Sequence, residues 1–168
     1  MPTGQLIECT RKDLVSQYVG ATSQKVADKV KEAMGGILFI DEAYALCKDD
    51  NDTYGREAID ALIADIENHR DNLMVILAGY SNDMDKFMDQ NQGLRSRIPT
   101  NILFEDYTTE EMVEIFKRNV KKDNKRLAAG LEQEIYQLIE EQKKAKNFGN
   151  ARGVRNLYEQ ISLNMDDR

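Results

Sequence analysis

The sequence has few of the residues that make turns, cross-links or metal sites. Its 168 residues include 2 prolines, 10 glycines, 2 cysteines and a single histidine. So few prolines and glycines argue against an all-β sandwich or barrel, which needs many tight turns. Cys9 and Cys47 form no CxxC or metal-ligand spacing, and His69 alone completes no zinc site. Two such cysteines are typical of a reducing compartment.

Long hydrophobic runs and excess positive charge are also missing. No apolar run approaches the roughly 18–20 residues of a membrane helix, and the first residues contain no apolar secretory segment. Lysine and arginine number 23 against 30 acidic residues, a net charge of −7. That balance argues against a broad nucleic-acid-binding surface. We therefore expect a cytoplasmic domain that engages neither a membrane nor a nucleic acid.

What is present is an alternation of apolar runs and helical stripes. Unbroken apolar runs bounded by glycine are typical of strands that are buried on both faces of a parallel sheet. The predicted strands are the apolar runs 37–40 and 73–78, a shorter run at 102–104, and a short β-leaning segment at 5–10. The predicted helices between them are 23–34 and 57–68. Strands that alternate with helices predict an α/β fold around a mostly parallel sheet.

The pattern changes after Asp106. Thr108 and Glu111 have the spacing of a capping box, which predicts the start of a helix with apolar residues on one side. Two further helical stripes follow, at 131–142 and 154–161. We therefore expect an α/β core over residues 1–105 and a small helical unit over residues 106–168.

Asp41 and Glu42 are the sharpest chemical feature, because they follow the predicted strand Ile37–Ile40 directly. Open α/β sheets place their ligand sites at the carboxyl ends of strands. One carboxylate there can hold a Mg²⁺ ion through water while its neighbour orients an attacking water. The plainer alternative is that both residues merely cap the next helix.

Three other segments contain residues suited to function, although each has an ordinary structural explanation. Two pairs of arginines, Arg95 with Arg97 and Arg152 with Arg155, can bind phosphate charge or can simply be solvated surface residues. Tyr18-Val19-Gly20 lies in a loop between a predicted strand and helix, where a tyrosine is more often a packing residue.

Taken in this order, the segments resemble the AAA+ ATPases of the group that contains stage V sporulation protein K and red-type Rubisco activase. The resemblance runs from about Gly4 to the end, and the segments that carry it are 13–22, 36–44, 55–59, 75–80, 93–97 and 148–152. It implies a P-loop NTPase-like parallel sheet with a helical lid, and ATP and Mg²⁺ as cofactors. It also implies a homo-oligomeric ring, hexameric as in the family, that acts on a protein client.

The resemblance also implies roles for single residues in catalysis. Asp41 matches the Walker B aspartate that positions Mg²⁺ through water, and Glu42 matches the glutamate that polarises the hydrolytic water. Arg97 matches the arginine finger that reaches a neighbour's ATP, and Arg95 is a second candidate for that role.

Further roles follow for nucleotide sensing and for the client. Arg152 is similar to the sensor-2 arginine of the lid, with Arg155 as the alternative. The sensor-1 position falls near Tyr80, and the neighbouring Ser81 and Asn82 stay open as alternatives. Tyr18, Val19 and Gly20 resemble the aromatic–hydrophobic–glycine pore loop that grips a polypeptide.

One motif of the family is missing. None of the ten glycines has a second glycine five residues later, so the chain contains no GxxxxGK[ST] phosphate loop. The resemblance implies that this loop precedes the strand near Gln5, within a strand–loop–helix unit of roughly 30 residues. We therefore favour a truncated sequence over a divergent enzyme, and we expect the chain alone to bind ATP weakly and not to hydrolyse it.

The missing strand has a structural consequence. In the family fold it lies between the strands at 73–78 and 101–104, so its absence leaves unpaired backbone groups on both. We expect those two strands to pair directly, or to borrow a strand from another copy.

Three functions are compatible with these residues. The first is an ATP-driven remodelling motor, and the second is a non-catalytic binding or scaffold module that keeps the fold but not hydrolysis. The third, a Mg²⁺-dependent nuclease built on Asp41 and Glu42, lacks further metal carboxylates and a basic groove. Intact acidic and arginine motifs favour an active parent protein.

Overall fold

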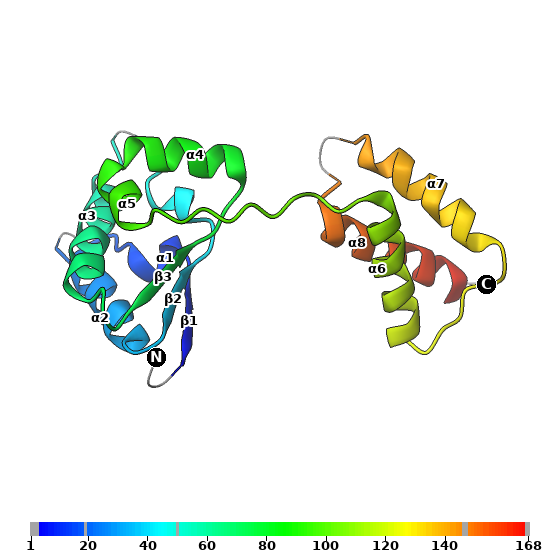
Figure 1. Ribbon diagram of the computed structural model, residues 1–168, viewed down its shortest axis with the longest axis horizontal. Helices are drawn as coiled ribbons and strands as arrows, with labels where there is room; N and C mark the ends of the chain where they lie inside the picture. The colour runs from blue at the N-terminus through cyan, green and yellow to red at the C-terminus, as the bar shows by residue number, and fades with distance from the viewer. Residues whose placement is uncertain (1–3, 19, 50, 146–147, 167–168) are drawn as a thin grey trace. The chain divides into compact units, whose positions relative to one another are not determined.

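The structure is a computed structural model that describes residues 4–18, 20–49, 51–145 and 148–166 (Figure 1). It divides into two compact units, Met1–Leu103 and Phe104–Arg168. The first unit contains a parallel sheet with helices and the second is entirely helical among its described residues. The predicted α/β class with a C-terminal helical lid is confirmed.

A three-stranded parallel sheet forms the centre of the first unit. Its strands are β1 (Leu6–Cys9), β2 (Ile37–Ile40) and β3 (Met74–Leu77), in the order β1-β2-β3. The helix α2 (Thr22–Ala33) connects β1 to β2, and α3 (Thr53–Asn68) connects β2 to β3. These three strands and two helices are the ones that the apolar runs and helical stripes predict.

Four short elements were not predicted. They are α1 (Arg11–Leu14), the 3-10 helix η1 (Ala43–Leu46), α4 (Ser81–Gln90) and α5 (Gln92–Arg97). Three of them span only four to six residues, too short for a helical period to show. In α4 most residues are polar, and Phe87 is its one buried side chain. Packing against neighbours therefore defines the three short helices, whereas α4 has an apolar stripe of Met84, Phe87 and Met88 at helical spacing that packs on the core.

The predicted strand at 102–104 is wrong. Residues 98–108 contain no regular secondary structure, and Ile102, Leu103 and Phe104 are 72%, 65% and 89% exposed. A strand needs a partner for its N–H and C=O groups, and β3 pairs only with β2 among the described strands. The expected direct pairing between β3 and this segment is therefore also wrong, and β3 is an edge strand.

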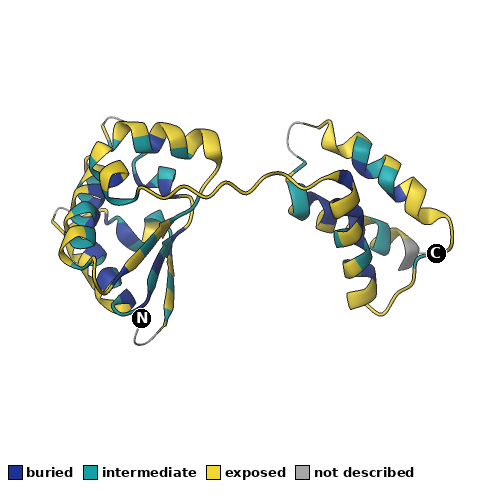
Figure 2. Ribbon diagram, viewed as in Figure 1, coloured by how far each residue is buried: buried dark blue, intermediate teal, exposed yellow. Residues whose placement is uncertain are grey.

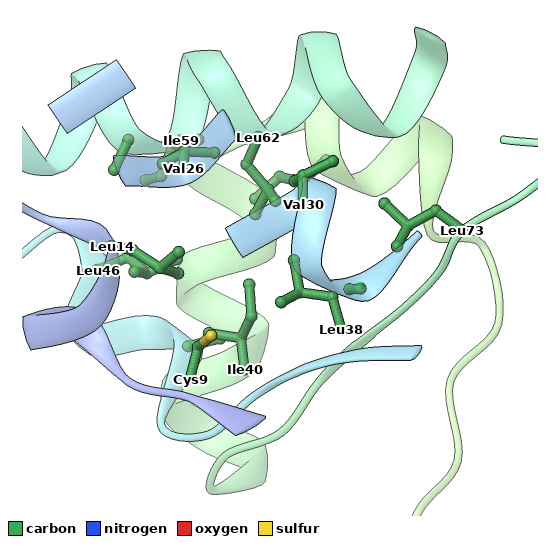
Figure 3. Close-up of a cluster of buried hydrophobic side chains, with 14 of the residues drawn as sticks. Cys9, Leu14, Val26, Val30, Leu38, Ile40, Leu46, Ile59, Leu62 and Leu73 are labelled. Carbon is green, nitrogen blue, oxygen red and sulfur yellow. The ribbon is translucent and has the colours of Figure 1, made fainter. Parts of the chain in front are cut away.

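The core of the first unit lies between one face of the sheet and the helices (Figure 3). Leu38 and Ile40 of β2 are completely buried, and they pack with Val26 and Val30 of α2. Ile59 and Leu62 bring α3 into the same cluster. Burial of a single such side chain stabilises a fold by about 1.5–3 kcal/mol, so this cluster fixes the position of the carboxyl end of β2.

The second unit consists of α6 (Thr109–Lys122), α7 (Leu131–Lys143) and α8 (Asn150–Asp166). The predicted capping box is confirmed: the Glu111 amide donates to the Thr108 hydroxyl at 3.2 Å and the Thr108 amide donates to the Glu111 carboxylate at 2.8 Å. Phe116 and Tyr158 meet edge to face in the core between α6 and α8. The unit therefore has its own hydrophobic centre.

Candidate functional site

Asp41 and Glu42 lie at the carboxyl edge of the sheet, where β2 ends. The Asp41 amide donates to the Cys9 carbonyl at 2.9 Å, which continues the β1–β2 ladder by one residue. Beyond Glu42, the Ala43 amide donates to the Ala78 carbonyl at 2.9 Å. Hydrogen bonds to both neighbouring strand ends therefore flank the two acidic residues, while both residues remain exposed.

Glu42 has a left-handed backbone, with φ 50° and ψ 46°. A residue with a Cβ atom rarely adopts this conformation, and it costs of order 1–3 kcal/mol when it does. The conformation turns the chain sharply from β2 into η1, whose first residue is Ala43. Because strained residues cluster at functional sites, the backbone of Glu42 independently supports the interpretation that this corner is a site.

The arrangement fits a hydrated metal ion. Asp41 accepts one hydrogen bond, from the Glu42 amide to its Oδ1 at 3.0 Å, and both carboxylates face solvent. Among the described residues no three His, Cys, Asp or Glu side chains converge as a metal cage. Mg²⁺ usually keeps several waters and binds one or two carboxylates together with substrate phosphates. The acidic pair therefore suits the metal, while nothing in the sequence supplies the phosphate loop.

The loop before α2 presents Tyr18 to solvent. Its side chain is 79% exposed, although both ends of the loop are anchored. The buried Ser16 amide donates to the Thr22 hydroxyl at 3.1 Å, and the Tyr18 amide donates to the Ser16 hydroxyl at 3.1 Å. Gly20 has φ +76°, a conformation that glycine adopts without strain. The predicted pore-loop residue Val19 lies outside the described residues.

This loop and the acidic pair share one groove. The residues that line a hollow of about 740 Å³ include Gln17 and Tyr18 as well as Asp41 and Glu42. Its remaining lining includes three lysines, Lys12, Lys25 and Lys48. The structure therefore brings together two groups of residues that are about twenty positions apart in the sequence.

The ring of Tyr80 lies against the ring of Tyr44, which is two residues after Glu42. The two rings are 6.5 Å apart between centroids, and Tyr80 is 68% exposed. Burial and the nearby carboxylates of Glu42 and Asp83 raise the pKa of the Tyr44 hydroxyl. Ser81 is the first residue of α4 and, like Asn82, it is exposed. All three candidates for sensor 1 therefore lie at the start of one helix.

The two arginines of α5 have different surroundings. Arg97 forms an ion pair between its Nε and Glu67 Oε2 at 3.1 Å, and one of its NH₂ groups donates to the Gly93 carbonyl at 3.2 Å. Arg95 pairs with Asp89 at 2.5 Å, and its side chain is 59% exposed against 31% for Arg97. Neither arginine lines the groove described above.

In the second unit, Arg152 and Arg155 are exposed in the first turns of α8. The side chain of Asn150 connects the start of this helix to the two residues Asp106 and Tyr107, which lie just before α6. Its Nδ2 donates to Asp106 Oδ1 at 2.7 Å, and its Oδ1 accepts from the Tyr107 backbone amide at 3.2 Å. These bonds fix the first residue of α8, two positions before Arg152.

One further contact near the site escaped the sequence analysis. Arg11 donates to the Ala45 carbonyl at 3.1 Å and to the Leu46 carbonyl, both in η1. It also forms a two-pronged ion pair with Asp52, at 2.6 and 3.1 Å. Asp52 in turn accepts from the Gly55 amide at 2.9 Å and so caps α3. Arg11 and Asp52 are 41 residues apart, so no local sequence pattern predicts their ion pair.

Two protein-family models match the chain. A family model described as "ATPase family associated with various cellular activities (AAA)" matches residues 3–106, and a second, described as "AAA lid domain", matches residues 108–168. The chain therefore belongs to the AAA ATPase family, as its resemblance to that family predicts. Among the described residues, no helix is both long enough and apolar enough to cross a membrane.

Similar proteins indicate to which group of the AAA ATPase family the chain is related. The chain is 46% identical over 166 residues to the "Protein CfxQ homolog" of Trieres chinensis, covering 98% of this chain and 57% of that protein. It is 43% identical to the "Protein CbbX" of Cereibacter sphaeroides, covering 98% and 54%. It is also 43% identical to the "Ribulose bisphosphate carboxylase/oxygenase activase, chloroplastic" of Cyanidioschyzon merolae, covering 98% and 57%. The chain thus spans little more than half the length of these relatives.

Proposed function

We propose that the chain is the hydrolytic part of an AAA+ protein-remodelling machine, which hydrolyses ATP between neighbouring subunits and draws a polypeptide client through a central pore. The observation that carries the proposal is that Tyr18, Asp41 and Glu42 line the same groove. A group that would grip a client and a group that would act on nucleotide then share one hollow of the surface. Similarity to a Rubisco activase makes Rubisco a candidate client.

The residues of the chain divide the chemistry between them. Asp41 would hold Mg²⁺ through water, and the ion would supply charge that neutralises the phosphates. Glu42 would orient the attacking water by accepting its hydrogen bond. Both carboxylates are exposed at the carboxyl end of β2, where they can do this. Such positioning and proton transfer contribute about 10²–10⁴-fold in rate.

Arg97 would stabilise the transferring phosphoryl group of the neighbouring subunit. A guanidinium group in this role is worth about 10³-fold or more. To reach a neighbour, Arg97 has to leave its ion pair with Glu67, whereas the more exposed Arg95 has only the surface pair with Asp89 to leave. The two arginines are therefore tested separately, by Arg97→Ala and Arg95→Ala.

The test joins this chain to the missing phosphate loop. The "Protein CfxQ" of Xanthobacter flavus is 44% identical to the chain over 161 residues, which cover 51% of that protein. In a chimera, the strand–loop–helix unit that the family resemblance implies is taken from the unmatched part of that protein and fused ahead of Gly4. We expect steady ATP turnover from the chimera, none from the 168-residue chain alone, and a loss of about 10²-fold or more from Glu42→Gln in the chimera. A chimera that binds ATP without hydrolysing it would contradict the proposal.

A scaffold module is the second candidate, and the absence of a GxxxxGK[ST] motif favours it for the chain as it stands. A scaffold would keep its partner binding when Glu42 is changed to Gln and would show no turnover in the chimera. The same experiment therefore separates the two functions.

A further inference from the structure

The end of α6 and the loop after it carry a dense group of cations. Of the ten residues from 117 to 126, six are lysine or arginine and one is acidic, although the whole chain has a net charge of −7. Most of these ten residues are exposed (Figure 2). A favourable interaction with the helix dipole explains Lys121 and Lys122 in the last turn of α6. It does not explain Lys125 and Arg126, which lie beyond the end of the helix.

Four of these six cations have no acidic partner in the part of the chain that the structure describes. Lys117 pairs with two glutamates of α6 and α7, and Lys125 donates to a hydroxyl of α8. The side chains without an ion pair or hydrogen bond to a described residue are Arg118, Lys121, Lys122 and Arg126. Like charges four residues apart destabilise a helix, and Arg118 and Lys122 have this spacing. An anionic partner would therefore stabilise the group.

Backbone hydrogen bonds hold the loop against the end of α6. The Asn124 amide donates to the Lys121 carbonyl at 3.1 Å, and the Lys125 amide donates to the Val120 carbonyl at 3.0 Å. These are the two bonds of a Schellman motif, and Asn124 has the left-handed backbone that the motif requires, with φ 56°. The cations on both sides of the helix end therefore keep fixed relative positions, so that binding a partner orders few further backbone groups.

An exposed leucine lies beside these cations. The loop after α6 runs along the last turns of α8, where the Tyr158 hydroxyl donates to Asp123, the acid of the segment, at 2.5 Å (Figure 1). Lys125 donates to the hydroxyl of Ser162 in the same helix. Leu163, the next residue, is 67% exposed. Because exposed ion pairs alone contribute little, this apolar side chain supplies a contact that charge cannot.

We propose that these side chains form a docking surface for an acidic segment of a partner protein. This surface, which we call the basic surface, consists of Arg118, Lys121, Lys122, Arg126 and Leu163. Carboxylates of the partner pair with the cations, and an apolar side chain between them contacts the leucine. Because the net charge of the chain is −7, an acidic partner is repelled elsewhere and is directed to this surface. The proposal goes beyond the proposed function, which uses none of these residues.

Other anionic partners fit the basic surface less well. Single-stranded nucleic acids bind where aromatic side chains stack on the bases, and none of the residues 117–126 is aromatic. A membrane surface is bound by a helix whose apolar face is free to enter it. The apolar face of α6 is instead buried in the core of its own unit, through Phe116 and Val120. The observations therefore favour an acidic polypeptide.

The experiment measures binding of a labelled peptide to the full 168-residue chain by fluorescence anisotropy. The peptide has glutamates on both sides of a central leucine, and a second peptide has glutamine in place of each glutamate. We expect saturable 1:1 binding of the first peptide and binding of the second that is weaker by about tenfold or more. We also expect the affinity for the first peptide to fall about tenfold when salt is raised from about 0.05 to about 0.3 M.

Substitutions of lysine by glutamine locate the binding surface. Lys122→Gln should weaken binding about threefold, and Lys121→Gln together with Lys122→Gln about tenfold. Because glutamine forms helices about as well as lysine, these variants keep α6 folded. Lys144→Gln removes the same charge from the exposed end of α7 and should leave binding unchanged.

A second pair of variants tests the apolar contact. Leu163→Asn should weaken binding about threefold. Leu131→Asn, at a residue of α7 that is 38% exposed, should leave binding unchanged.

Several results would overturn the proposal. The first is the absence of measurable binding of the glutamate peptide, and the second is equal binding by Lys122→Gln and Lys144→Gln. The third is tighter binding of an RNA oligonucleotide or of phosphatidylserine vesicles than of the peptide, because the partner would then be a nucleic acid or a membrane. The last is self-association of the chain that Lys122→Gln abolishes, because the partner would then be a second copy. None of these measurements depends on ATP turnover, so the proposed function is tested separately.

Discussion

At Glu42 an unusual backbone conformation coincides with a proposed chemical role. The sequence marks it as the second of two acids after a buried strand, but its left-handed backbone follows from its place between β2 and η1. No local pattern announces that conformation, because glutamate is not a residue that prefers it. Residue type and order thus lead to a hypothesis about the site, whereas the left-handed backbone of Glu42 could not be predicted from them.

The backbone of Glu42 leads to a stability prediction. Glycine adopts φ +50° without strain, whereas alanine keeps the penalty of its Cβ atom. We expect Glu42→Gly to be more stable than Glu42→Ala by about 1 kcal/mol in free energy of unfolding, measured with urea. If the two variants are equally stable, Glu42 is not held in the left-handed region. Both variants should lack turnover in the chimera.

The Arg11–Asp52 pair predicts a pH dependence. The hydrogen bonds from Arg11, followed by those from the Lys48 and Gly55 amides, hold the pKa of Asp52 well below its ordinary value of 3.8. A lowered pKa in the folded state contributes stability above the unfolded value, and this contribution is lost as the pH falls toward the folded value. Asp52→Asn should therefore cost about 2 kcal/mol at pH 7 and clearly less at pH 3.

Urea unfolding at the two pH values checks this expectation. Asp85→Asn, at an exposed residue of α4, controls for the loss of one negative charge. If Asp52→Asn lowers the free energy of unfolding equally at pH 3 and pH 7, the Arg11–Asp52 ion pair does not stabilise the corner formed by η1 and the start of α3.

At the scale of elements, the strongly periodic segments were predictable and the short ones were not. Apolar runs identified β1, β2 and β3, and the capping box identified the start of α6. The run at 102–104 has the same composition but no neighbour to pair with, so composition alone misled. A strand is a property of two segments, and a single sequence window describes only one.

Gly153 gives a prediction at this scale. A Cβ atom on Gly153 would lie 1.8 Å from the Phe148 carbonyl oxygen, closer than any real contact. Gly153→Ala must therefore displace the segment that leads into α8, at a cost of about 1–3 kcal/mol. Asn156→Ala, at an exposed position three residues later in α8, should stay within about 0.5 kcal/mol of the original protein. Thermal unfolding followed by circular dichroism distinguishes the two, and equal stabilities would exclude the close approach.

At the scale of the whole molecule, the chain contains the acidic pair, both arginine motifs and the lid, and it lacks the phosphate loop. Motif order predicted this division, and among the described strands β3 has a partner on one side only. The family membership explains why these parts belong together. That they act between subunits is the central claim of the proposed function.

Mixing two inactive subunits tests that claim most directly. In the chimera, Glu42→Gln would remove the group proposed to position water in a subunit's own site, and Arg97→Ala would remove the group proposed to act on a neighbour's site. Each variant alone should be inactive. In an equimolar mixture, random assembly creates about one intact interface in four, because each interface takes one group from each of two neighbours. The account predicts recovery of about one quarter of the unmutated turnover, and no recovery on mixing would contradict it.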